Sequence, residues 1–175
     1  MIEKLLPGWT WKRLVLEVLP HLVAVLFFAF LADGFYNKYD DGYKLRQSDS
    51  MNYAGMSKEA TDYRILFQDQ TYWTGAMFSG MPTFQITGQS KGSIQMHQVL
   101  SRPFRNMFTS NEELTLWFGM VGAYLLALAL GVSPWLAMLA GVAFGLSSIN
   151  VLYFGAGHRT KVRAIGFMPG VLAGV

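Results

Sequence analysis

The stretch from Leu114 to Phe154, LTLWFGMVGAYLLALALGVSPWLAMLAGVAFGLSSINVLYF, decides the fold. It contains two apolar runs, 114–132 and 134–154, which meet at Ser133–Pro134. At about 1.5 Å per residue each run forms a helix of roughly 28–32 Å, which matches the hydrocarbon thickness of a bilayer. The proline of the join is well placed to begin the second helix. The stretch therefore predicts a helical hairpin inside a membrane.

A third apolar run, 14–32 (LVLEVLPHLVAVLFFAFLA), lies near the N-terminus and is also long enough to cross a bilayer. A cleaved signal peptide is the competing interpretation. However, the run is long for the apolar region of a signal peptide, and cleavage after Ala32 would place the bulky Phe30 where a small residue is required. We therefore expect an uncleaved transmembrane helix at 14–32.

The composition excludes several classes of protein. Of the 175 residues, 52% are hydrophobic and 14% are charged, whereas a soluble domain carries about 25% charged residues. The absence of cysteine excludes disulfides, zinc–thiolate sites and thiol catalysis. The sequence contains no Walker A loop, HExxH motif or dinucleotide fingerprint. Its basic residues flank the apolar runs rather than forming a groove-sized patch, so we expect no binding of nucleic acid.

Cationic residues predict the orientation of the chain. Lys4, Lys12 and Arg13 precede the first run. The positive-inside rule therefore places the N-terminus, 1–13, in the cytoplasm and the 33–113 loop outside. We expect a multi-pass membrane protein with its N-terminus in the cytoplasm.

The last segment, 155–175, is at odds with this orientation because the stretch 156–163 (AGHRTKVR) is basic and would face outward. Either the orientation is reversed, or the stretch forms an anion-binding surface at the outer membrane face. The apolar residues that follow, 164–175, form about 18 Å of helix, which is too short to span a bilayer. We expect them to be a partial fourth segment that belongs to a longer chain or needs other subunits.

The 33–113 loop is too aromatic for a disordered linker. We expect a helix that begins with Ser48 as its N-cap and lies along the membrane surface. The segment 73–86 is rich in turn residues, and its aromatic side chains suit the headgroup layer. The predicted fold is therefore an all-α integral membrane protein. It has three transmembrane helices, a partial fourth apolar segment and a large outer loop with an interfacial helix.

Three motifs carry a resemblance to a known family. They are QSDSMNYAGMSKEATDYR (47–64), WTGAMFSGMPTFQI (73–86) and AGHRTKVRAIGFMP (156–169). In this order they resemble segments of bacterial YfhO-family membrane proteins, which are classed with the C-type (GT-C) glycosyltransferases. The resemblance covers nearly the whole chain, although Arg159 and Arg163 stand where the family pattern has Asn and His.

The resemblance implies a bundle of transmembrane helices in a bacterial inner (cytoplasmic) membrane, which transfers a sugar from a polyprenyl-phosphate donor at the outer face. It implies that Asp49 is the catalytic base or a metal-site carboxylate, and that His158, Arg159, Lys161 and Arg163 hold the donor phosphate. The alternative for Asp49 is a charge that interacts with a helix dipole. The alternative for the basic residues is contact with anionic lipid headgroups.

Ionisable groups inside the first run are a second candidate site. Glu17 and His21 are one helical turn apart and so share a face. They could dock a neighbouring helix or snorkel to the interface, or His21 could ligate a haem or chlorophyll-type pigment. Asp40 and Asp41 are either divalent-cation ligands or solvated loop charges.

Two functions remain open from the sequence. The first is the N-terminal module of a YfhO-like polyprenyl-phosphate-sugar-dependent glycosyltransferase, which we expect not to catalyse as 175 residues alone. The second is a truncated, non-catalytic relative that packs as an accessory subunit in a respiratory or photosynthetic membrane complex. The expected partners are membrane lipids together with the lipid-linked sugar or the other subunits.

Overall fold

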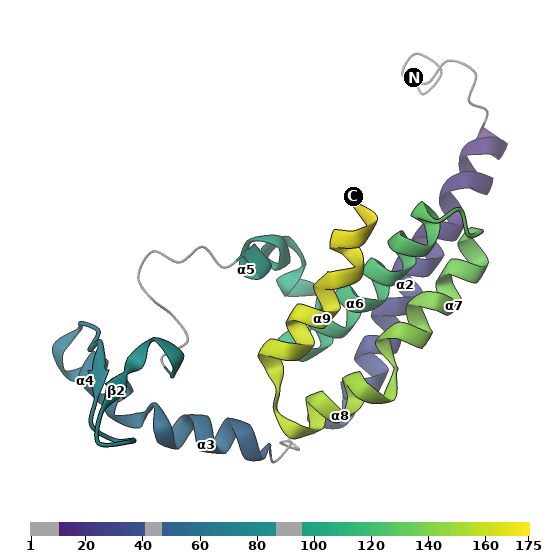
Figure 1. The fold of residues 1–175 in the computed structure, drawn as a ribbon. Helices are drawn as coiled ribbons and strands as arrows, with labels where there is room; N and C mark the ends of the chain where they lie inside the picture. The colour runs from purple at the N-terminus through teal and green to yellow at the C-terminus, as the bar shows by residue number, and fades with distance from the viewer. Residues whose placement is uncertain (1–10, 41–46, 87–95) are drawn as a thin grey trace.

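The computed structural model describes residues 11–40, 47–86 and 96–175, which are mostly helical (Figure 1). The elements in chain order are α2 (Trp11–Asp40), α3 (Ser48–Met56), α4 (Lys58–Phe67), β1 (Trp73–Thr74), β2 (Met81–Pro82), η1 (Thr83–Gln85), α5 (Met96–Ser101), η2 (Arg102–Met107), α6 (Asn111–Ala129), α7 (Pro134–Gly145), α8 (Ser148–Ala156) and α9 (Arg159–Ala173). Helices α2 and α6 to α9 form a bundle. The elements α3, α4, β1, β2 and η1 extend from one end of it, whereas α5 and η2 lie against its side (Figure 1).

Three helical stretches are long and apolar enough to cross a membrane: Val15–Tyr36, Asn111–Ala129 and Pro134–Ala156. Each overlaps one of the three apolar runs in the sequence. The prediction of a mostly helical chain with three candidate membrane spans is therefore confirmed at this level. Helix α2 continues beyond 14–32 at both ends.

Helix α6 is the centre of the bundle and contacts α2, α7 and α9. In its apolar window 61% of the residues are buried, against 22% in each of the other two candidate spans. The Trp117 indole Nε1 donates a hydrogen bond to the Val25 carbonyl oxygen of α2 at 3.2 Å. The large apolar side chains that α2 and α7 leave exposed suit a lipid environment.

Glycines allow the central helices to approach closely. The α6 glycines face those of α9, since a Cβ on Gly119 would lie 3.5 Å from the Gly166 Cα atom and one on Gly122 would lie 3.0 Å from the Gly170 nitrogen. The short apolar segment that follows the basic stretch is thus the C-terminal part of α9, packed along α6 (Figure 1). Small residues at helix contacts are typical of membrane bundles.

The third candidate span is broken rather than continuous. We expected one helix over 134–154, but α7 ends at Gly145 and α8 begins at Ser148. The Asn150 amide Nδ2 donates to the Phe144 carbonyl oxygen at 2.8 Å, where the helical hydrogen bonds are interrupted. Side chains that satisfy freed backbone groups make such a break tolerable at membrane depth.

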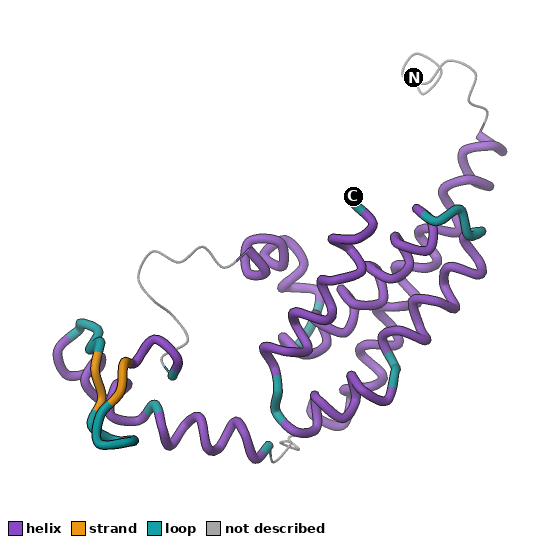
Figure 2. The backbone as a smooth tube through the Cα atoms, viewed as in Figure 1, coloured by secondary structure: helices purple, strands orange, loops and turns teal. Residues whose placement is uncertain are grey.

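The loop between the first two spans folds into a small lobe, which we define as residues 48–86. Its helical part begins with Gln47 as the N-cap rather than Ser48, and it turns at Ser57 between α3 and α4. Within the segment 73–86, which we predicted to be rich in turns, β1 and β2 form an antiparallel hairpin (Figure 2) that pairs Trp73 with Pro82.

Glu59 fixes this hairpin to α4. Its carboxylate accepts hydrogen bonds from the Thr74 hydroxyl at 2.5 Å and from the Gly75 backbone nitrogen at 3.4 Å. Both hydrogen bonds favour the charged carboxylate, so they hold the pKa of Glu59 below its usual value. The bond from the Thr74 hydroxyl has the larger effect and the bond from the Gly75 nitrogen the smaller one.

Candidate functional site

The start of α3 docks on the turn between α8 and α9, more than a hundred residues later in the chain. The Gln47 amide Nε2 donates to the Phe154 carbonyl oxygen at 2.7 Å, near the C-terminal end of α8, where the same oxygen also accepts a bond from the Gly157 nitrogen at 3.2 Å. The Gln47 Oε1 atom accepts a bond from the Ser50 hydroxyl at 2.9 Å. The start of the first motif is thus fixed to the residues just before the third.

Gly157 makes this close contact possible. It ends α8 with a φ of +92°, a left-handed conformation that favours glycine. A Cβ atom at this position would lie 3.0 Å from both the Gln47 Cβ and the Ser50 Oγ atoms. The glycine of the AGH sequence therefore serves both the turn and the docking of α3.

The docking brings together two residues that the resemblance assigned to the site. The Asp49 Oδ2 atom lies 2.7 Å from the His158 Nδ1 atom. The two side chains are 47% and 32% exposed, so solutes can reach both. A carboxylate on Nδ1 orients the ring and leaves Nε2 for a second partner. The pair can therefore accept and hold a proton.

The other predicted phosphate-binding residues come together only in part, since Arg159 and Arg163 line one small pocket with Glu112 and Lys161 does not line it. Arg159 is held by Glu112, with 2.9 Å between the Arg Nε and Glu Oε1 atoms. The Lys161 Nζ atom lies 5.5 Å from the ring centroid of Tyr153. Arg163 lines a cavity of about 140 Å³ elsewhere on the same helix.

That cavity contains two arginines that we did not predict as site residues. Arg102 and Arg105 of η2 line it together with Arg163 of α9. The sequence places both arginines just before the second span, but nothing in their spacing indicates that α9 lies beside them. Only the packing of α9 on α6 brings the three together.

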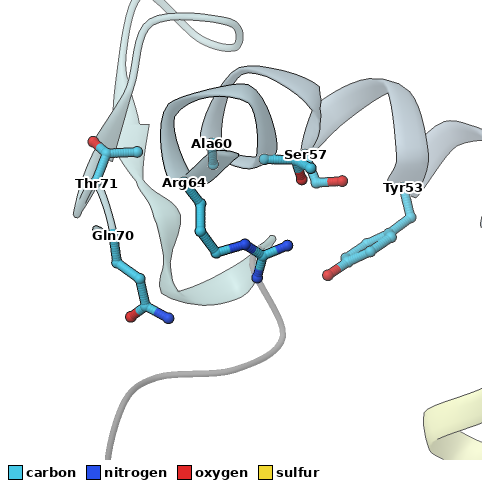
Figure 3. Close-up of a pocket in the computed structure, with 7 residues that line it drawn as sticks. Tyr53, Ser57, Ala60, Arg64, Gln70 and Thr71 are labelled. Carbon is cyan, nitrogen blue, oxygen red and sulfur yellow. The ribbon is translucent and has the colours of Figure 1, made fainter. Parts of the chain in front are cut away.

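A second pocket, of about 120 Å³, lies in the lobe between α3, α4 and the segment before the hairpin. Figure 3 shows the Arg64 guanidinium between the side chains of Gln70 and Tyr53. Tyr53 is four residues after Asp49, so both lie on one face of α3. The pocket is therefore close, along α3, to the Asp49–His158 pair.

The two candidate residues of the first span, Glu17 and His21, have different surroundings in the structure. The His21 Nδ1 atom lies 2.6 Å from the Tyr124 hydroxyl of α6, so His21 joins two helices of the same chain. Glu17 is exposed on α2. Asp41 lies outside the described residues, as does the side chain of Asp40. Within the part of the chain that the structure describes, no group of three or more His, Asp or Glu side chains could hold a metal ion.

The chain is thus a mostly helical protein with three candidate membrane spans and a polar docking site at one end of the bundle. No protein-family model matches it, and comparisons with curated proteins and with solved structures found no significant match.

Proposed function

We propose that the chain is the N-terminal module of a YfhO-like membrane glycosyltransferase that uses a polyprenyl-phosphate sugar. The observation that carries the proposal is the 2.7 Å contact between Asp49 and His158. These residues belong to two of the motifs that resemble the family, and they meet at the end of the bundle from opposite parts of the chain. A purely structural loop would not require an exposed acid–imidazole pair at this position.

In the proposed reaction Asp49 accepts the proton of an acceptor hydroxyl. The hydroxyl oxygen forms a bond to the anomeric carbon of the donor sugar, and the bond between that carbon and the phosphate oxygen breaks. The electron pair of that bond leaves with the polyprenyl phosphate. His158 orients the Asp49 carboxylate through the contact at its Nδ1 atom.

The proposal places the docking site at the outer face of a bacterial inner membrane, with the N-terminus in the cytoplasm. Basic residues before α2 support this orientation through the positive-inside rule. The acceptor would then approach from outside, where the exposed lobe pocket lies one turn along α3 from Asp49.

The test is complementation in the natural host with the whole protein that carries this chain. The gene is deleted and restored as wild type, Asp49→Asn or Asp62→Asn, and membrane and surface glycans are compared by mass spectrometry. Asp62 is a matched control because it is an exposed acid of the lobe that pairs with Lys58 on the surface. Protein levels are compared by immunoblot.

We expect deletion to remove a glycan that wild type and Asp62→Asn restore and that Asp49→Asn does not. A general base contributes about 10²–10⁴ in rate, so the loss should be close to complete. Full restoration by Asp49→Asn would remove that residue from the mechanism. A deletion that changes no glycan but depletes a membrane complex would overturn the transferase proposal in favour of an accessory subunit.

A further inference from the structure

The cavity beside α9 has the composition of a binding site for an amphiphile. It lies between η2, α6 and α9 and has a volume of about 140 Å³. Its cationic lining comes from Arg102, Arg105 and Arg163. Its apolar lining includes Phe118 and Phe167.

None of the three arginines forms an ion pair with another residue of the ranges 11–40, 47–86 and 96–175. Glu112 lines a smaller pocket beside Arg163, but its ion pair is with Arg159. The nearest acids along α6 are already engaged: Glu112 holds Arg159, and the buried Glu113 carboxylate accepts bonds from the Ser110 hydroxyl and the Thr109 nitrogen. Three like charges around one cavity make it attractive to an anion, although solvent screens the repulsion between the exposed Arg102 and Arg105.

The chemistry of the arginines indicates which anion fits. A guanidinium offers a planar fork of donors that matches phosphate oxygens, and several forks can share one phosphate. Arg102 and Arg105 are exposed and Arg163 is half-buried, so a ligand can reach them from outside the bundle. These properties favour a phosphate group over a neutral ligand.

The aromatic side of the cavity indicates what the phosphate is attached to. The ring centroids of Phe118 on α6 and Phe167 on α9 are 5.2 Å apart, where the two helices pack together. Phe167 is one helical turn beyond Arg163 along α9, and Phe118 belongs to the apolar window of α6. An apolar chain attached to the phosphate could therefore lie on these rings at membrane depth.

We propose that Arg102, Arg105 and Arg163 bind the phosphate of a lipid phosphate monoester or diester, with its apolar chain against Phe118 and Phe167. The inference deepens the proposed function, on which it rests for the identity of the lipid as a sugar donor. It moves the phosphate site away from Arg159 and Lys161, which have partners of their own. Binding of the lipid does not itself require transfer of a sugar.

The experiment is native mass spectrometry of the whole protein in detergent, with undecaprenyl phosphate as the probe. Phosphatidylglycerol, phosphatidylethanolamine and inorganic phosphate are the comparison ligands. The variants are Arg102→Gln, Arg105→Gln, Arg163→Gln and the triple variant. Arg64→Gln is the matched control, because Arg64 lines the separate lobe pocket. Thermal unfolding shows whether each variant keeps the fold. If Arg163→Gln does not fold, Arg163→Lys replaces it in the binding measurements.

We expect undecaprenyl phosphate to bind wild type and Arg64→Gln equally, and each single Gln variant about tenfold more weakly, as expected for loss of one charge-assisted contact. Phosphatidylglycerol binding with the same variant dependence would identify a membrane lipid headgroup as the ligand and still support the site. Unchanged binding of undecaprenyl phosphate in the triple variant would overturn the inference, as would equally strong binding of inorganic phosphate, which has no apolar chain. Phosphatidylethanolamine, a phosphodiester without net charge, should bind more weakly than phosphatidylglycerol if the arginines bind a net anionic headgroup, and equal binding of the two would contradict that requirement.

The two proposals fail in different ways. If Asp49→Asn abolishes glycan transfer while the triple arginine variant binds the probe normally, the proposed function stands and this inference falls. If the probe binds through the arginines but deletion of the gene alters no glycan, the binding site stands and the transferase proposal falls.

Discussion

Gly157 illustrates how one residue joins two distant parts of the chain. The turn after α8 needs a positive φ at Gly157. The start of α3 packs so closely against the same residue that no room is left for a Cβ atom. Gly157→Ala would place a Cβ atom 3.0 Å from the Ser50 hydroxyl in a backbone conformation that costs an L-residue about 1–2 kcal/mol. We expect a lower unfolding midpoint in detergent and faster proteolysis of the lobe.

The control for this prediction is Gly155→Ala. Gly155 lies in α8 with no atom within 4 Å of its Cβ position, so an alanine there adds no contact and favours the helix. If both variants unfold and are digested like wild type, Gly157 does not hold the docking contact.

Asp49 and His158 show what residue patterns predict and what they do not. The resemblance assigned both to one site, and the structure places them in contact. Nothing in the sequence spacing measures the distance between them, because it depends on how α3 returns to the α8–α9 turn. The arginine cavity was missed for the same reason, since Arg102 and Arg105 are separated from Arg163 by two helical spans.

At the scale of elements, Glu59 makes the hairpin sensitive to acid. Its pKa in the folded lobe is lowered from 4.5 by the bonds from Thr74 and Gly75. Because the folded value is the lower one, the contribution of Glu59 to lobe stability is present above 4.5 and is lost as the pH falls through the folded value. We expect the hairpin to loosen on acidification.

A spin label on Phe78→Cys at the hairpin tip measures this loosening, because the chain has no other cysteine. The mobility of the label should rise below pH 4.5 in the wild-type background. It should depend less on pH in Thr74→Val, which lacks the hydrogen bond from the Thr74 hydroxyl to Glu59. Mobility that is constant on acidification in both backgrounds would contradict the role of Glu59.

The packing of α7 on α2 and α6 depends on Gly141. A Cβ atom there would lie 2.5 Å from the Phe28 Cζ atom and 2.8 Å from the Met120 carbonyl oxygen, and the backbone oxygen cannot move aside as a side chain can. We expect Gly141→Ala to destabilise the bundle by about 1–3 kcal/mol, as overpacking does. Thermal unfolding in detergent measures this.

Gly34→Ala is the comparison for Gly141. Gly34 lies in α2 with nothing within 4 Å of its Cβ position. An alanine there should leave stability unchanged or raise it by up to about 1 kcal/mol. Equal stability of the two variants would show that α7 does not pack on Phe28 and Met120 in this way.

Helices could be predicted from the sequence where the local pattern of apolar residues determines them. The three candidate spans were predictable because apolar runs of membrane length are rare in helices that face water on one side. The break after Gly145 was not predicted, because α8 continues the apolar run. The signal is the polar Asn150 inside that run, whose amide contacts the Phe144 carbonyl only once the chain has turned.

At the scale of the whole molecule, the fold fixes which segments share an end of the bundle. The lobe and the start of α9 lie at one end, and the α6–α7 turn at Ser133 lies at the other (Figure 1). If α6 and α7 cross a membrane as a hairpin, these two ends face opposite compartments. The natural absence of cysteine allows each end to be labelled separately.

We predict the result of labelling Phe78→Cys, Thr160→Cys and Ser133→Cys with a membrane-impermeant maleimide in spheroplasts. The first two should react in intact spheroplasts, because the positive-inside rule places the end that carries them outside. Ser133→Cys should react only after permeabilisation. The reverse pattern would leave the bundle intact but invert its orientation. The basic stretch after α8 would then face the cytoplasm, and the proposed polyprenyl-phosphate donor would have to be used there. Reaction of all three in intact spheroplasts would instead show that α6 and α7 do not cross the membrane as a hairpin.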